Sequence, residues 1–141
     1  MANELYQKQI IELARGSRKR ARIDTPDTTI RFDNPLCGDR IDIDFSIEDG
    51  RISDIGFKVR GCALCEASSE ILARTAVGHE MQELNAIGNS LSDYLSGSLD
   101  RPDWEEYEVF EPVKNVPPRH ECVLLPFNAI KKLLKNLSRS Y

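Results

Sequence analysis

Apolar and polar residues alternate along the middle of the chain, and a period of two is typical of β-strands with one buried face. Within segment 40–47 the apolar positions are Ile41, Ile43, Phe45 and Ile47. After a turn at 48–51 the alternation resumes over 55–59, and a shorter run at 29–33 precedes both. The pattern predicts an antiparallel meander of about three strands.

Helical spacing of apolar residues flanks this predicted sheet on both sides. Segment 4–15 predicts an amphipathic helix, and a second helix is expected over 62–78. Ser90 and Asp93 have the spacing of a capping box, which predicts a short helix through residue 95.

The C-terminal part of the chain divides into two segments of different character. Segment 97–118 holds four of the seven prolines and the only tryptophan, so we expect an irregular excursion there. A last amphipathic helix follows Cys122 by at most one turn, because Pro126 fits a first turn but not a helix interior. Its expected inward residues are Phe127, Ile130, Leu133, Leu134 and Leu137.

These elements predict a single α+β domain over residues 1–141, with a small antiparallel sheet packed against helices. No apolar stretch reaches the roughly 18 residues that suggest a membrane span. The first ten residues lack the basic start and apolar run of a signal peptide. We therefore expect a cytoplasmic protein whose four cysteines serve metal binding or catalysis rather than disulfides.

The formal net charge of −4 gives no reason to expect nucleic acid as the main partner. One local exception is a basic run, formed by Arg15, Arg18, Lys19, Arg20 and Arg22. Such a run is usually a solvated linker, and docking on an acidic protein surface is the main alternative. We interpret 15–24 as a basic linker after the first helix.

Three of the four cysteines fall at the ends of predicted elements. Cys37 lies in a loop between two strands, Cys62 at a strand-to-helix junction, and Cys122 ahead of the last helix. Side chains in such places converge on one surface point more readily than thiols on core faces. Asp39 adds an oxygen donor near Cys37, although a turn residue that bonds its own backbone is the alternative. Three thiolates and one carboxylate are compatible with tetrahedral zinc, and thiolates also suit iron–sulfur clusters.

The pair Cys62 and Cys65 leaves three interpretations open: half of a zinc site, a dithiol redox pair, or one working cysteine with a neighbour. Residues three apart share a helix face, so contact between them is expected in any case. A thioredoxin-like oxidoreductase usually carries tryptophan and Gly-Pro around the pair, which are missing here, and it leaves Cys37 and Cys122 unexplained. A purely structural zinc module is the other alternative.

Three motifs carry a resemblance to a known family: NPLCGDRIDIDF, GFKVRGCALCEASS and RHECVLLPFNAI. In this order they resemble the cysteine motifs of the IscU/SufU family of iron–sulfur cluster assembly proteins, which is homologous to the N-terminal domain of NifU. The long stretch before the last cysteine, and Arg119 three residues ahead of Cys122, are more similar to the SufU branch. IscU proteins have a histidine where this chain has Glu121.

The resemblance implies a small α+β protein that takes sulfur from a cysteine desulfurase of the SufS or IscS kind. IscU-type members assemble a [2Fe–2S] cluster on three cysteines; SufU-type members hold zinc through three cysteines and an aspartate. By position these residues are Cys37, Asp39, Cys62 and Cys122, with Cys37 as the sulfur acceptor. The protein is then at most a sulfurtransferase-type persulfide acceptor, and otherwise a scaffold. Arg119 is the expected partner contact, and apo-proteins or cluster carriers are candidate downstream partners.

Cys65 departs from the family pattern, which does not usually place a cysteine there. The resemblance assigns Cys62 as the ligand and Cys65 as its neighbour, with a spare or alternative ligand as the second interpretation. We expect His79 and His120 to be exposed to solvent, and His120 is the one substitute ligand that its position near Cys122 supports.

Overall fold

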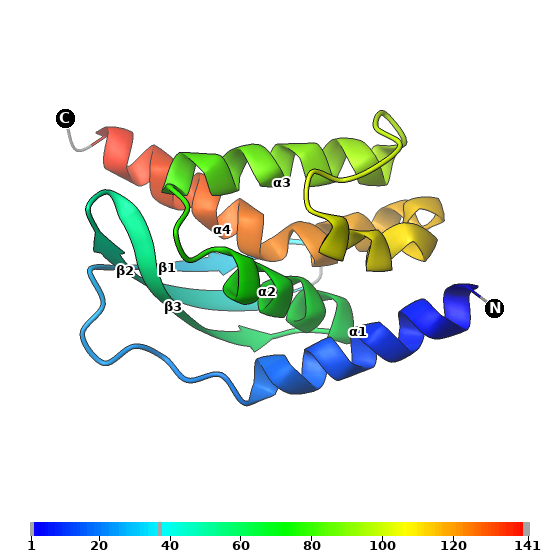
Figure 1. Ribbon diagram of the computed structural model, residues 1–141, viewed down its shortest axis with the longest axis horizontal. Coiled ribbons are helices and arrows are strands. Elements are labelled where there is room, and N and C mark those ends of the chain that lie inside the picture. The colour runs from blue at the N-terminus through cyan, green and yellow to red at the C-terminus, as the bar shows by residue number, and fades with distance from the viewer. Residues whose placement is uncertain (1, 37, 140–141) are drawn as a thin grey trace.

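The computed structural model of the chain describes residues 2–36 and 38–139 (Figure 1). Its α-helices and strands confirm the expected α+β class. In chain order they are α1 (Ala2–Arg18), β1 (Thr28–Asp33), β2 (Arg40–Glu48), β3 (Arg51–Arg60), α2 (Ala63–Thr75), α3 (Met81–Ser96) and α4 (His120–Arg139). Two 3₁₀ helices, η1 (Glu105–Asn115) and η2 (Pro117–Arg119), connect α3 to α4.

The sheet is the predicted antiparallel meander, in the order β1-β2-β3. Ile43 on the central strand pairs with Ile30 on one side and Phe57 on the other, and all three are buried. The expectation for Ile47 is wrong, since its side chain is 42% exposed. The register shifts opposite Ser46 and Ile47, whose partners are Asp54 and Ile52, so Ser53 of β3 is the extra residue of a β-bulge near this end of the sheet.

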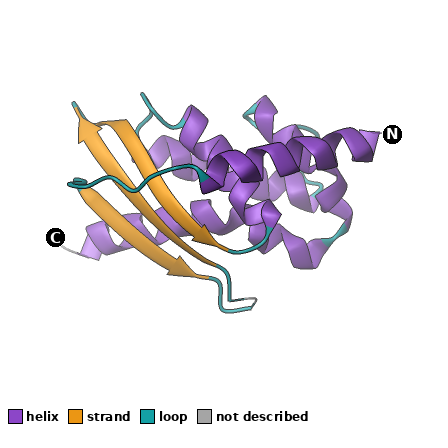
Figure 2. Ribbon diagram, turned by 90° about the horizontal axis from the view of Figure 1, so that it is seen from below, coloured by secondary structure: helices purple, strands orange, loops and turns teal. Residues whose placement is uncertain are grey.

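Helices α2 and α4 pack against each other and against the sheet, while α1 lies along α2 and α3 lies along α4. Figure 2 shows the C-terminal part of α4 passing behind the strands. The buried face of the sheet and these two helices form the core, whose fully buried side chains include Ile41, Phe45, Ile71, Leu72 and Leu125. None of the helices in the described ranges is long and apolar enough to cross a membrane.

Helix α3 is longer than the sequence pattern indicated, and the predicted capping box at Ser90 and Asp93 is wrong. The helix begins at Met81, and its capping box is formed by Glu80 and Glu83. Ser90 instead lies within the helix, where its Oγ accepts a hydrogen bond from the Asp103 amide at 3.3 Å. The Glu80 carboxylate stands at the cap position in place of the more common Ser, Thr, Asp or Asn, so the sequence carries no typical start signal for this helix.

The segment expected to be irregular, 97–118, contains η1 and the first two residues of η2. Aromatic side chains fix it to the core: Tyr107 and Phe110 are fully buried, and the Tyr107 ring meets Phe127 of α4 edge-on at 5.6 Å. A 3₁₀ helix has three residues per turn, so its apolar residues do not follow the spacing of 3.6 that predicts an α-helix, and the sequence pattern did not predict η1 or η2.

The start of α4 also differs from expectation. The helix begins at His120, so Cys122 lies within its first turn and Pro126 lies inside the helix. Pro126 has no N–H to donate to the carbonyl of Cys122, four residues earlier, so the helix loses one hydrogen bond near its start. At the other end Leu137 is 47% exposed, contrary to the inward position expected for it.

The basic run is not a free linker. Arg15 and Arg18 belong to the last turn of α1, and three arginines bind carboxylates within the protein. We call these three ion pairs the arginine cluster: Arg18 with Glu66, Arg20 with Glu70, and Arg22 with Asp44. The carboxylate members are at most 8% exposed, so the expected solvated linker instead ties α1 and the following loop to α2 and β2.

Candidate metal centre

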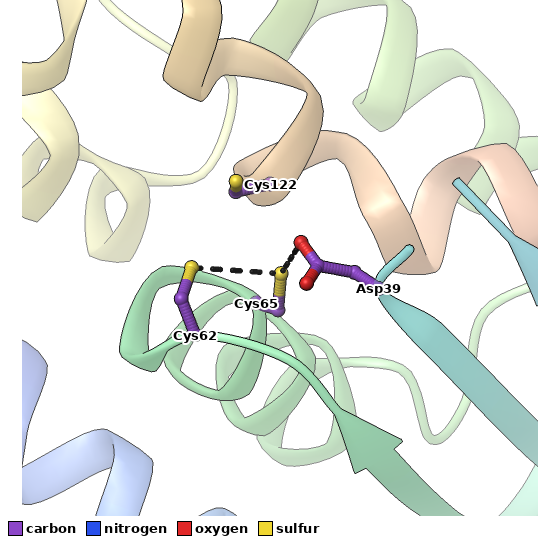
Figure 3. Close-up of side chains that lie close together, drawn as sticks. All are labelled: Asp39, Cys62, Cys65 and Cys122. Atoms are coloured by element: carbon purple, nitrogen blue, oxygen red, sulfur yellow. Dashed lines mark hydrogen bonds between the residues drawn. The ribbon is translucent and has the colours of Figure 1, made fainter. Parts of the chain in front are cut away.

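Four potential metal ligands meet where β2, α2 and α4 begin (Figure 3). Asp39 directly precedes β2, and Cys62 is the residue that caps α2. Cys65 lies in the first turn of α2 and Cys122 in the first turn of α4. One ligand atom from each of the four residues lies within 4.8 Å of every other.

Cys65 is at the middle of this group. Its Sγ lies 3.8 Å from the Cys62 Sγ, and its thiol donates a hydrogen bond to Asp39 Oδ2 at 3.1 Å. Gly61 makes the approach of the strand end to the group feasible, because a Cβ there would lie 3.1 Å from both the Asp39 carboxyl and the Cys65 sulfur. A side chain at position 61 would therefore press on the candidate ligands.

The two neighbouring thiols differ in their protonation. The Cys65 thiol, and with smaller effect the first-turn amides, lower the pKa of Cys62 to about 5 against the opposing effect of burial. Cys62, burial and the Asp39 carboxylate raise the pKa of Cys65 well above its ordinary value. Cys65 thus favours the thiolate form of Cys62, while Cys65 itself favours the thiol form, whose proton it donates to Asp39.

The donor set fits zinc or an iron–sulfur cluster. A zinc–sulfur bond of about 2.3 Å places two sulfurs of a regular tetrahedron about 3.8 Å apart, and the Cys62 and Cys65 sulfurs are separated by 3.8 Å. Thiolates are soft ligands that suit zinc and iron–sulfur clusters, and one carboxylate oxygen is also an accepted zinc ligand. Cys122 is 3% exposed whereas Cys62 and Asp39 are half-buried, so solvent reaches the group from their side.

A groove of about 390 Å³ lies beside the centre, between α1, α2 and the segment before α4. Leu64, two residues after Cys62, and Arg119, three residues before Cys122, both line it. Two of its other lining side chains are exposed apolar ones, Ile11 at 50% and Val116 at 44%. The centre is thus bordered by an apolar surface with one exposed arginine.

Comparison with known proteins decides the family. The profile of the NifU-like N-terminal domain matches residues 5–137. This chain belongs to the NifU-like N-terminal domain family. The resemblance of its three motifs to this family is thereby confirmed.

Individual relatives of the NifU-like chain carry two kinds of name. The iron–sulfur cluster assembly scaffold protein IscU of Thermotoga maritima is 25% identical over 136 residues, which cover 96% of each chain. The zinc-dependent sulfurtransferase SufU of Bacillus subtilis is 24% identical over 130 residues, covering 91% of this chain and 88% of its own. Among solved structures, a NifU-like N-terminal protein from Brucella abortus has a TM-score of 0.83 at 27% identity and covers 95% of this chain.

The structure of this NifU-like domain brings together three of the four ligands that the sequence assigned: Asp39, Cys62 and Cys122. The fourth, Cys37, lies outside the described residues. Cys65, assigned as a neighbour or spare ligand, is as close to the group as the others. Arg119 is exposed at the end of η2, on the groove beside the centre.

The two histidines are half-buried rather than exposed as expected. His120 directs its Nε2 toward the carbonyl oxygens of Val113 and Lys114, at 3.0 and 3.2 Å. It is not among the metal-ligating groups found in the described part of the chain. His79 pairs with Glu83 at 3.2 Å.

Sequence reasoning underestimated one member of the centre. The three-residue spacing indicated that Cys65 would lie beside Cys62, but nothing local indicated that its thiol would reach Asp39, 26 positions earlier. The signal available was the position of Cys65 in the first turn of a helix that Cys62 caps, since that turn faces whatever lies at the helix start.

Proposed function

We propose that this protein takes part in iron–sulfur cluster assembly by accepting sulfur from a cysteine desulfurase at a metal-bound cysteine site. The observation that supports this most strongly is the convergence of Asp39, Cys62 and Cys122 at the start of three elements in a NifU-like chain. A thioredoxin-like dithiol oxidoreductase needs only the Cys62 and Cys65 pair, and it gives no role to Cys122 or Asp39. Membership of the NifU-like family also argues against it.

The residues proposed to hold the metal are Cys37, Asp39, Cys62 and Cys122. A zinc ion or an iron–sulfur cluster bound there keeps its thiolates deprotonated at neutral pH. The protein itself positions two of the ligands at helix starts, where packing of α2 and α4 fixes them. In the sequence Cys37 falls between the last residue of β1, Asp33, and the first of β2, Arg40.

Sulfur transfer to Cys37 conserves atoms and electrons without an added oxidant. The Cys37 thiolate attacks the terminal sulfur of a persulfide on the desulfurase, and a new S–S bond forms at Cys37. The S–S bond of the partner breaks, and its cysteine leaves as a thiolate that is reprotonated from the persulfide or from water. The protein then carries one additional sulfur atom, ready for assembly.

The partner is proposed to dock over the groove beside the centre. Ile11 and Val116, the exposed apolar side chains of the groove, offer surface that a partner would bury, and Arg119 offers a positive charge at its rim. Truncating an arginine that pairs with a carboxylate in a desolvated interface typically weakens binding by about 2–5 kcal/mol. Arg119 is therefore the residue whose loss should weaken the complex most specifically.

The test measures cysteine turnover by the cognate desulfurase with and without this protein. We expect faster turnover with the parent protein, no gain with Cys37→Ala, and added sulfur on Cys37 by mass spectrometry. Arg119→Ala should raise the half-saturating concentration by about 10-fold or more. The control is Arg101→Ala, an exposed arginine outside the groove. Unchanged turnover together with no persulfide on any of the four cysteines would contradict the proposal.

A cluster scaffold is the second candidate, and the name of the Thermotoga maritima relative favours it. Anaerobic purification followed by metal analysis separates the two forms of the proposal. A colourless protein with one zinc supports the sulfur relay, and a brown protein with iron and sulfide supports the scaffold.

A further inference from the structure

Cys65 has a place in the centre that the family pattern does not explain. Its side chain is fully buried, as a core thiol would be. However, its sulfur contacts two polar groups, the Cys62 sulfur and the Asp39 carboxylate, and lies between them (Figure 3). A thiol that serves only packing has no need to face two candidate metal ligands.

The four described residues form a complete donor set by themselves. Asp39, Cys62, Cys65 and Cys122 offer three sulfurs and one oxygen, all within 4.8 Å of one another. Four such ligands satisfy tetrahedral zinc, and the Cys62 to Cys65 separation of 3.8 Å equals a tetrahedral edge. The 3.1 Å between the Cys65 sulfur and the Asp39 oxygen is a hydrogen-bond distance and has to lengthen by only a few tenths of an ångström.

We propose that the Cys65 thiolate is a metal ligand that completes a four-residue site with Asp39, Cys62 and Cys122 whenever Cys37 is not bound to the metal. The inference rests on the proposed function for the role of Cys37. Binding displaces the Cys65 proton to solvent, and the hydrogen bond to Asp39 is replaced by metal coordination of both groups. Cys37 then receives sulfur without release of the metal.

This arrangement resolves a conflict in the chemistry of the relay. A thiolate held by zinc is a poor nucleophile, so the acceptor has to leave the metal before it attacks a persulfide. In a site with three remaining ligands, that departure leaves the metal open to water and to loss. Cys65, held in the first turn of α2, is already at the distance required to fill the open position.

The main alternative is that Cys65 only orients Asp39 through its hydrogen bond. Such supporting partners typically change metal affinity by about 10–100-fold. The two roles are separable because serine retains a hydroxyl that donates to Asp39 but lacks the sulfur. Cys65→Ser therefore preserves the supporting role and removes the ligand role, whereas Cys65→Ala removes both.

The experiment compares Cys37→Ala with the double variants Cys37→Ala/Cys65→Ser and Cys37→Ala/Cys65→Ala. Metal-free proteins are titrated with cobalt(II), whose thiolate charge-transfer absorption grows with the number of sulfur ligands, and with zinc(II) against a chromophoric chelator. We expect Cys37→Ala to bind with three thiolates. Both double variants should bind with two thiolates and lose more than about 100-fold in zinc affinity, beyond the effect of a supporting partner.

Three results would overturn the inference. If Cys37→Ala/Cys65→Ser matches Cys37→Ala in thiolate number and affinity, Cys65 only supports Asp39. If both double variants match Cys37→Ala, Cys65 is a core thiol. X-ray absorption on zinc-loaded Cys37→Ala gives the sulfur count without any change at Cys65, so the test survives misfolding of the double variants; two sulfurs there also refute the ligand role.

Failure of the proposed function has a different signature. A protein that binds metal through Cys65 but acquires no persulfide from the desulfurase would refute the relay and leave the ligand role of Cys65 intact. A protein that acquires persulfide on Cys37 but whose metal site lacks Cys65 would do the reverse.

Discussion

The candidate metal centre and the arginine cluster both include residues of α2, but their buried polar groups are paired in opposite ways. Each carboxylate of the cluster faces a guanidinium: Glu66 accepts two hydrogen bonds from Arg18 at 2.8 and 2.9 Å. Asp44 accepts bonds from Arg22, the Thr29 hydroxyl and the Ile23 amide. At the centre, the Cys65 thiol of α2 instead donates its hydrogen bond to another candidate ligand, Asp39, and lies 3.8 Å from the Cys62 sulfur.

This difference separates structure from chemistry. In a bidentate arginine–carboxylate pair the two charges neutralise each other and both carboxylate oxygens accept hydrogen bonds, so the cluster is a poor site for an external ion. Thiols that face one another and a carboxylate form only weak hydrogen bonds, and a metal ion that replaces their protons binds these groups more strongly. Substitutions in the arginine cluster should therefore lower the free energy of unfolding and leave metal affinity unchanged. Substitutions at the centre should lower metal affinity and leave the free energy of unfolding of the metal-free protein unchanged.

The largest expected effect on stability is at Arg22. In Arg22→Ala the Asp44 carboxylate, 1% exposed, loses its guanidinium but keeps the hydroxyl and amide donors. Since Arg22 is itself 42% exposed, we expect a loss of about 1–3 kcal/mol in the free energy of unfolding of the metal-free protein by urea. Arg31→Ala, which removes a more exposed pair with Asp42, is the matched control and should cost less. A change in zinc affinity with Arg22→Ala would show that the two regions are coupled.

The next prediction compares two glycines: Gly61 lies close to the candidate metal ligands, and Gly16 lies equally close to the arginine cluster. A Cβ at Gly61 would lie 3.1 Å from Asp39 and Cys65, and a Cβ at Gly16 would lie 3.2 Å from Glu70 and Arg74. Gly61→Ala displaces candidate ligands, so we expect zinc affinity to fall by about 10-fold, as for a disturbed supporting partner. Gly16→Ala meets only the ends of flexible side chains and adds helix propensity, so zinc affinity should not change. Equal affinities for both variants would contradict the assignment of ligands.

The smallest effect is the acid dependence of the cluster. Burial raises the pKa of Asp44, but Arg22, Thr29 and the Ile23 amide together hold it below its ordinary value. The folded state thus favours the carboxylate, and its contribution to stability is fully present above the ordinary aspartate pKa of about 3.9. It is lost as the pH falls from there through the lower pKa of the folded state. Urea unfolding between pH 5 and about pH 2 should show this decline, weaker in Arg22→Ala and unchanged in Cys62→Ser.

Patterns of short range were enough to predict much of the fold. The alternation over 40–47 and 55–59 gave the meander, because each strand pairs with its sequence neighbour and one face is buried. The β-bulge did not follow, since its extra residue, Ser53 of β3, is defined only by how β3 pairs with β2. Likewise the aromatic anchors of 97–118 are specified by contacts with α4 that no local period records.

For the candidate site, the sequence determined the kinds of ligand and the elements that carry them: thiols at the starts of α2 and α4, and a carboxylate before β2. Motif spacing also determined the family, because those residues recur in a fixed order. Only the tertiary structure decided that the Cys65 thiol reaches Asp39 and that the basic run binds Glu66, Glu70 and Asp44. Both depend on the packing of α1, α2 and the sheet, which brings together residues 20 to 50 positions apart whose interactions leave no periodic trace along the chain.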